Sequence, residues 1–128
     1  MQYKNNPLSP HLQIYKWQIS SLLSIAHRIV GVINILAVTL ICLWATSLLF
    51  GESAYEITKT FLNSFFGKFI LISLCWTFSF HILNEIRHLA WDAGYGFDIK
   101  IAKITGIIAF FGSFVLTIVF YLLGKNIF

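Results

Sequence analysis

The chain has 128 residues, of which 58% are hydrophobic and only 11% are charged, whereas a soluble domain carries about 25% charged residues. A single small core could not bury the 13 Phe and 4 Trp side chains, so these figures exclude a soluble globular domain. Disorder is excluded as well, because it requires low hydrophobicity and high charge. The net charge of +4 comes from basic residues that mark the ends of apolar runs, which is typical of a membrane protein and not of a nucleic-acid binder.

Three apolar stretches are long enough to cross a bilayer, which takes about 20 residues. None of them alternates apolar and polar residues as a barrel strand does, so each is predicted to be a helix. Their apolar cores are residues 29–50, 61–83 and 104–123, and the complete spans are expected at about 24–50, 61–89 and 103–123. The sequence therefore predicts an all-α integral membrane protein with a single domain over residues 1–128.

The segments between the spans are short and more polar. Pro7 and Pro10 predict an extended N-terminal segment, because proline disfavours helix at the residue before it. The segments expected to lie outside the helices are residues 1–18, 51–60, 92–103 and 124–128. Cys42 and Cys75 each lie inside an apolar run, and we expect them to be small buried residues and not a disulfide or metal ligands.

The distribution of basic residues predicts which way the chain crosses the membrane. With the N-terminus inside, the inner side receives Lys4, Lys16, Arg28, Arg87, Lys100 and Lys103, and the outer side receives Lys59, Lys68 and Lys125 together with Glu52 and Glu56. An excess of basic residues marks the cytoplasmic or matrix side, so the predicted topology is N-in and C-out.

Polar residues gather at two places inside the predicted spans, and their spacing of three, four or seven places each group on one helical face. The groups are Ser24, His27, Arg28, Gly31 and Asn34 near the start of the first span, and His81, Asn84, Glu85 and His88 at the end of the second. Both fall in one layer on the inner side of the predicted topology. Ionisable residues within spans are costly and tend to mark function.

His81 lies about 9 Å deeper than Arg87, at 1.5 Å per helical residue, which is too deep for an imidazole to reach the headgroups. It is therefore hydrogen-bonded, protonated in transport or a metal ligand, and imidazole is a common ligand of haem iron.

Two further patterns predict packing and anchoring rather than chemistry. The third span carries a stripe of small residues that lets helix backbones approach closely, namely Gly106, Ala109, Gly112 and Ser113. The aromatic residues at span ends are expected to anchor the chain at the membrane interfaces, and these are Trp17, Trp91, Tyr95 and Tyr121.

Two motifs resemble a known family. Residues 9–15 (SPHLQIY) with 24–31 (SIAHRIVG), and residues 81–92 (HILNEIRHLAWD), are similar in order and separation to the cytochrome b subunit of succinate dehydrogenase, complex II. The resemblance covers essentially the whole chain. It implies one half of a heterodimeric haem-binding helical anchor in a bacterial plasma membrane or a mitochondrial inner membrane.

The resemblance also implies partners, cofactors and site residues. The chain would pair with a second three-span anchor subunit and, with an iron–sulfur and a flavoprotein subunit, pass succinate electrons to ubiquinone as a non-catalytic subunit. His81 falls on the axial ligand of the haem b iron. Ser24 and Arg28 fall on positions that contact ubiquinone. His27 and Arg28 fall where haem propionates or quinone are met, and His88 lies near the same groups.

The chain departs from the family pattern at three positions, Asn6, Val30 and Glu85. Glu85 stands where a glycine is common, so it adds bulk and charge beside His81 and either pairs with Arg28 or Lys16 or weakens the haem site. Two other functions stay open: a structural anchor without haem, and a small proton-coupled transporter subunit built on the second polar stripe.

The second axial ligand of the haem is expected to come from the partner anchor subunit. On the predicted span ends, His27 is level with His88 and about 9 Å out of register with His81 along the membrane normal. His27 is therefore expected to meet haem propionates and not the iron.

Overall fold

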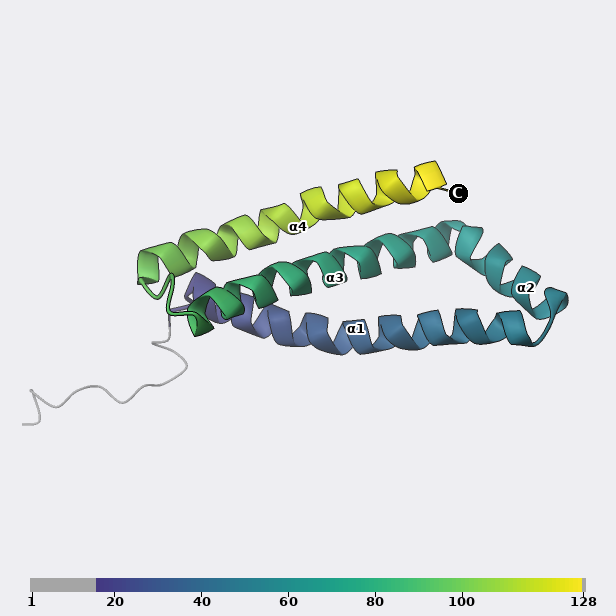
Figure 1. The fold of residues 1–128 in the computed structure, drawn as a ribbon, viewed down its shortest axis with the longest axis horizontal. Helices are drawn as coiled ribbons and strands as arrows, with labels where there is room; N and C mark the ends of the chain where they lie inside the picture. The colour runs from purple at the N-terminus through teal and green to yellow at the C-terminus, as the bar shows by residue number, and fades with distance from the viewer. Residues whose placement is uncertain (1–15, 128) are drawn as a thin grey trace, which may run out of the picture.

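A computed structural model describes residues 16–127 of the chain, with side chains to residue 125. The described part is built from four helices: α1 (Ile19–Leu49), α2 (Glu52–Asn63), α3 (Phe65–Asp92) and α4 (Ile99–Ile127). The three long helices lie lengthwise beside one another, and the short α2 joins α1 to α3 at one end (Figure 1). α1, α3 and α4 are each long and apolar enough to cross a membrane, so the predicted all-α fold with three spans is confirmed.

The boundaries differ from the predicted ones in three places. The segment 51–60 is mostly α2 and not a loop, so that prediction was wrong. The second connection is shorter than predicted because α4 already begins at Ile99, and the tail after Leu123 continues α4 and does not lie outside it. The predicted extended segment 1–18 lies mainly outside the described residues.

The break between α2 and α3 comes from Ser64 and Gly67. The Ser64 hydroxyl oxygen accepts a hydrogen bond from the Gly67 N–H at 3.1 Å and so caps the N-terminus of α3. Gly67 is buried against the end of α2, where a β-carbon would overlap the Phe61 carbonyl oxygen and lie 2.7 Å from the Leu62 Cα. The chain can therefore turn sharply between the two helices only because residue 67 has no side chain.

The small-residue stripe of α4 packs against α3, as predicted. Ala109 and Ser113 are buried, and a β-carbon on Gly112 would contact Leu83 at 3.4 Å. Serine and threonine hydroxyls in this interface bond mainly to carbonyls of their own helix, as Ser113 does to Phe110. Helix backbones thus approach closely without leaving these polar groups unpaired.

The outer surfaces of the long helices remain apolar and exposed. Only 6% of the most apolar window of α1 is buried within the chain, against 22% for α3 and for α4. Cys42 on α1 is exposed, so the prediction that it is a buried residue was wrong, and Cys75 is half-buried. Most of α1 therefore faces lipid or another subunit instead of this chain's own core.

Gly67→Ala should destabilise the α2–α3 turn by about 1–3 kcal/mol, because the new methyl group meets backbone atoms that cannot rotate away. The expected result is a lower melting temperature of the detergent-solubilised complex. Gly124→Ala is the matched control, since no heavy atom of the described chain lies within 4 Å of its β-carbon position. Equal melting temperatures for the two variants would contradict the role given to Gly67.

Candidate functional site

A cluster of three histidines joins α1 to α3 in the half of the bundle that holds the start of α1. The rings of His27 and His81 are stacked, with centroids 4.3 Å apart and planes within 13°. His88 approaches the His27 ring edge-on at 5.2 Å. Gly31 lies over His81, since a β-carbon there would stand 3.5 Å from its Cε1. The His81 ring therefore lies close to the backbone of α1, at a distance where a β-carbon would make an ordinary van der Waals contact.

This arrangement corrects the depth assigned to His27. It was expected to be level with His88 and out of reach of His81, yet it contacts both rings. The physical reason lies in the helix ends: α1 begins at Ile19 and α3 continues to Asp92, so both helices are longer than predicted. At 1.5 Å per residue, His27 is about 12 Å from its helix end and His81 about 16 Å from its own.

Glu85 brings a carboxylate to the histidine cluster. Its Oε1 lies 3.1 Å from His27 Nε2 and 3.7 Å from His81 Nε2. Among the described residues its ion-pair contacts are therefore the two histidines, and the alternative that it pairs with Arg28 or Lys16 was wrong. The three side chains bring possible ligand atoms within 4.8 Å of one another.

Two imidazole nitrogens of the cluster are buried without a hydrogen-bond partner in the described chain, namely His27 Nε2 and His81 Nδ1. The short distance from His27 Nε2 to Glu85 is thus an ion-pair contact that lacks hydrogen-bond geometry. Unpaired buried nitrogens are costly in an apolar environment. Such atoms are available to a group that this chain alone does not supply.

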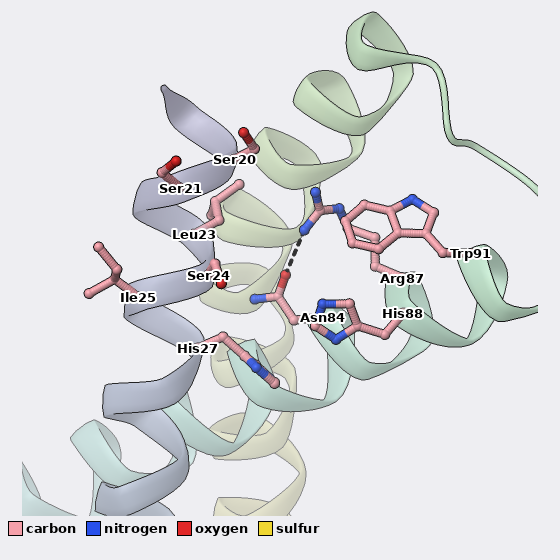
Figure 2. A pocket seen from close by; sticks show the side chains of 10 residues that line it. All are labelled: Ser20, Ser21, Leu23, Ser24, Ile25, His27, Asn84, Arg87, His88 and Trp91. Atoms are coloured by element: carbon pink, nitrogen blue, oxygen red, sulfur yellow. Dashed lines mark hydrogen bonds between the residues drawn. The ribbon is translucent and has the colours of Figure 1, made fainter. Parts of the chain in front are cut away.

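Beside the cluster, an open pocket of about 500 Å³ lies between the first turns of α1 and the last turns of α3. Its walls combine serine, amide, imidazole and guanidinium groups with apolar side chains (Figure 2). The lining residues are Ser20, Ser21, Leu23, Ser24, Ile25, His27, Asn84, Arg87, His88 and Trp91. No carboxylate is among them.

Arg87 is the most constrained side chain of this pocket. It is only 8% exposed, and its Nε donates to the Thr105 hydroxyl at 3.1 Å while one terminal nitrogen donates to the Ala102 carbonyl at 2.9 Å. The other terminal nitrogen donates to Asn84 Oδ1 at 3.1 Å. The Trp91 ring covers the guanidinium at 4.5 Å, a cation–π contact. Arg87 therefore ties α3 to the first turns of α4.

The structure brings together most, but not all, of the predicted site residues. Ser24, His27 and His88 line the pocket, and His81 lies next to it through its stack with His27. Arg28 is exposed on α1 and does not line the pocket. Asn34, one turn beyond Gly31, instead accepts a hydrogen bond from Thr77 at 3.0 Å and links α1 to α3.

Sequence reasoning missed Arg87 as a site residue, because it treated this arginine as a charge at a helix end. Trp91 was assigned to membrane anchoring alone, and Ser20 and Ser21 were not considered. The usable signal was the spacing: Asn84, Arg87, His88 and Trp91 follow one another at three, one and three residues, which continues the polar face of α3 by one turn.

Comparisons with known proteins agree with this architecture. The sequence matches the family of succinate dehydrogenase/fumarate reductase transmembrane subunits over residues 2–120. The chain belongs to this family. It is 42% identical to the succinate dehydrogenase cytochrome b556 subunit of Rickettsia felis, over 81% of each chain. It is 34% identical to the Paracoccus denitrificans b556 subunit over 89% of this chain and 88% of that protein.

A relative named as a b560 subunit is similar over a comparable length. The succinate dehydrogenase cytochrome b560 subunit of Reclinomonas americana is 40% identical over 93% of this chain and 86% of that protein. The predicted family, the role as a membrane anchor of complex II and the membrane location are therefore confirmed. As a succinate dehydrogenase transmembrane subunit, this chain works with other subunits of that complex.

Proposed function

We propose that this transmembrane subunit binds one side of a haem b and a ubiquinone, and so helps electrons pass from the iron–sulfur subunit to quinone. The observation that carries the proposal is the buried His81 Nδ1, which has no hydrogen-bond partner in the described chain. Relatives named cytochrome b556 and b560 subunits support a haem. Burying unpaired imidazoles inside apolar helices is costly unless another group pairs with them.

The histidine cluster contains a residue that can bind the iron of such a haem. His81 offers a buried imidazole nitrogen with no partner in the described chain, and its ring lies next to Gly31 of α1. Bound haem would supply a one-electron redox centre at this depth. His27 and His88, next to His81, and Arg28, on the exposed side of α1, would contact its edge or propionates. Glu85 would hold one His81 nitrogen and leave the other for the iron.

The second axial ligand is proposed to come from the second three-span anchor subunit. Two axial nitrogens lie on opposite sides of the iron, about 4 Å apart for bonds of about 2 Å each. The His27 ring is stacked on the face of His81, with planes 13° apart, so its nitrogens lie beside those of His81 and do not point at them. This ring stacking, and not a difference in depth along the membrane normal, therefore makes His27 unsuitable as the second ligand.

In the assembled complex, His81→Leu should abolish the low-spin haem signal because it removes an axial ligand. His27→Leu is the matched control, and it should retain low-spin haem because a ring stacked on a ligand does not itself bind the iron. Dithionite-reduced absorption and electron paramagnetic resonance spectra measure the difference. A normal low-spin spectrum for His81→Leu would contradict the assignment, and assembly of the unmodified complex without haem would support the alternative of a structural anchor.

Ubiquinone is proposed to bind in the pocket between α1 and α3, near Ser24 and Arg28. Ser24 lines the pocket with a hydroxyl, a group that can donate to a quinone carbonyl. Arg28 lies four residues further along α1, so its long side chain starts one turn from Ser24. The pocket lies at the end of the bundle that holds the last turns of α3 (Figure 1).

Ser24→Ala and Arg28→Leu should each slow quinone reduction, because each removes a donor to the quinone oxygen. Succinate oxidation by a water-soluble artificial acceptor should survive, since that reaction does not need the membrane site. Steady-state kinetics of both reactions on the purified complex provide the measurement. Unchanged quinone kinetics in both variants, with intact assembly, would move the quinone away from this pocket.

The same proposal fixes the orientation of the subunit. Because the polar pocket lies at one end, that end should face the iron–sulfur and flavoprotein subunits on the inner side, with the N-terminus in and the C-terminus out. Within the described residues, Lys16, Arg87, Lys100 and Lys103 lie toward this end, and Lys59, Lys68 and Lys125 toward the other. The distribution supports the orientation predicted from charge.

A further inference from the structure

The most deeply buried polar group of the pocket is the amide of Asn84, which the proposed quinone site does not yet use. Asn84 is 1% exposed, and its Oδ1 accepts a hydrogen bond from Arg87 at 3.1 Å. Its Nδ2 is buried and has no hydrogen-bond partner in the part of the chain that the structure describes. Figure 2 shows this nitrogen on the side of the amide that faces α1 across the pocket.

We propose that Asn84 Nδ2 donates a hydrogen bond to a carbonyl oxygen of the quinone headgroup, with Arg87 as the residue that positions and polarises the amide. The inference rests on the proposed binding of quinone in this pocket. It adds a donor from α3 to the α1 residues Ser24 and Arg28. The ring would then lie between the two helices and contact both.

Arg87 fixes which end of the amide faces the pocket. A guanidinium offers only donors, so it can pair with the oxygen of Asn84 and not with its nitrogen. Rotating the amide by half a turn would place two donors against each other and break the 3.1 Å bond. Thr105 and Ala102 hold the guanidinium from α4, so it cannot follow such a rotation. The amide nitrogen is thereby directed to the ligand side.

Arg87 also gives the amide an electrostatic role. Its guanidinium has no carboxylate within ion-pair distance among the described side chains, residues 16–125, so none of these residues neutralises its charge. A donor to Asn84 Oδ1 polarises the amide and makes Nδ2–H a stronger donor in turn. Such a donor favours an acceptor oxygen that gains negative charge on reduction, as the oxygens of a quinone do.

The rest of the pocket suits a flat, neutral headgroup. Its volume of about 500 Å³ lies within the range of roughly 300–1,000 Å³ that small-molecule sites occupy. Leu23, Ile25 and Trp91 supply apolar walls, and Ser24 supplies a hydroxyl on the opposite helix. A ring with carbonyl groups at its edge can therefore use the donors of both helices while its faces contact apolar side chains.

Asn84→Asp in the whole complex removes the Nδ2 donor and keeps an oxygen that accepts from Arg87, so it tests the donor separately from the structural bond. The carboxylate keeps an acceptor for Arg87, which also holds it ionised, but replaces the Nδ2 donor with an oxygen that repels a quinone carbonyl. The KM for a short-chain ubiquinone should rise at least about tenfold, while the low-spin haem spectrum and succinate oxidation by an artificial acceptor stay unchanged. Asn84→Leu, which keeps the approximate size of the side chain and offers no donor, should give the same rise and serves if the aspartate variant fails to assemble.

Asn34→Asp is the matched control, since it places the same carboxylate in α1 where the side chain accepts from Thr77 and does not line the pocket. Its KM should remain that of the unmodified complex. An unchanged KM in both Asn84 variants would overturn the proposal and leave Asn84 as a structural partner of Arg87. A rise in KM that is equal in the Asn34 variant would also overturn it.

A pocket-filling substitution, Ser24→Trp, distinguishes this failure from failure of the proposed quinone site. If Ser24→Trp raises the KM and the Asn84 variants do not, quinone binds in the pocket and only the donor assignment is wrong. If Ser24→Trp and the Asn84 variants all leave the KM unchanged, quinone binds elsewhere and both proposals fall. If the pocket instead binds the phosphate of a lipid, the Asn84→Asp complex should bind that lipid more weakly while its KM for quinone stays unchanged. That result would overturn the donor assignment.

Discussion

The hydrogen bonds of the buried Arg87 guanidinium hold the polar end of the bundle together. One side chain of α3 reaches a hydroxyl and a carbonyl of α4, and on its own helix it fixes the Asn84 amide. Removing it would leave Asn84 Oδ1 without its donor in a buried place, which is costly. Gly106 makes the arrangement possible, because a β-carbon there would overlap Leu23 and stand 3.4 Å from the guanidinium.

Outside the pocket and the histidine cluster, most polar side chains have partners within the subunit. Apolar side chains cover the outer faces of the long helices. The hydroxyls of α3 and α4 bond mainly within their own helices or to each other, and Thr77 also donates to Asn34 of α1. Polar groups without partners in the described chain are concentrated near the pocket and the histidine cluster, with Trp76 Nε1 as the exception. Because the bilayer core offers no water to such groups, their concentration at one end indicates where cofactor, substrate and partner subunits are expected.

The sequence was sufficient for the three long helices and for the two polar stripes, since both depend on composition and helical spacing alone, but it did not predict α2. It was insufficient for the break at Ser64, because Asn63 and Ser64 form only a short polar interruption of an apolar run, and the turn depends on the cap and on Gly67. It also misjudged His27, because depth was measured from helix ends that were several residues too short. The direction of the long Arg87 side chain depends on its partners in α4. The spacing of residues within α3 does not predict these partners.

Glu85 is a second residue whose contacts the spacing along the sequence did not predict. Its position on the polar face of α3 was predictable, but its choice of partner among the nearby basic residues was not. The structure places its carboxylate between His27 and His81, at the centre of the cluster. Glu85, which stands where a glycine is common in the family, therefore contacts the histidines directly. The polar residues of α3 thus form a connected group with His27 of α1.

The central claim is that the pocket, the histidine cluster and the soluble subunits share one side of the membrane. Reporter fusions test it directly in the assembled complex, with one reporter after Lys125 and another in the connection near Glu52. Both should report the outer side, because three spans with an inner N-terminus place the far ends of α1 and α4 there. An inner-side signal at either position would contradict the account, since the pocket would then face away from the source of electrons.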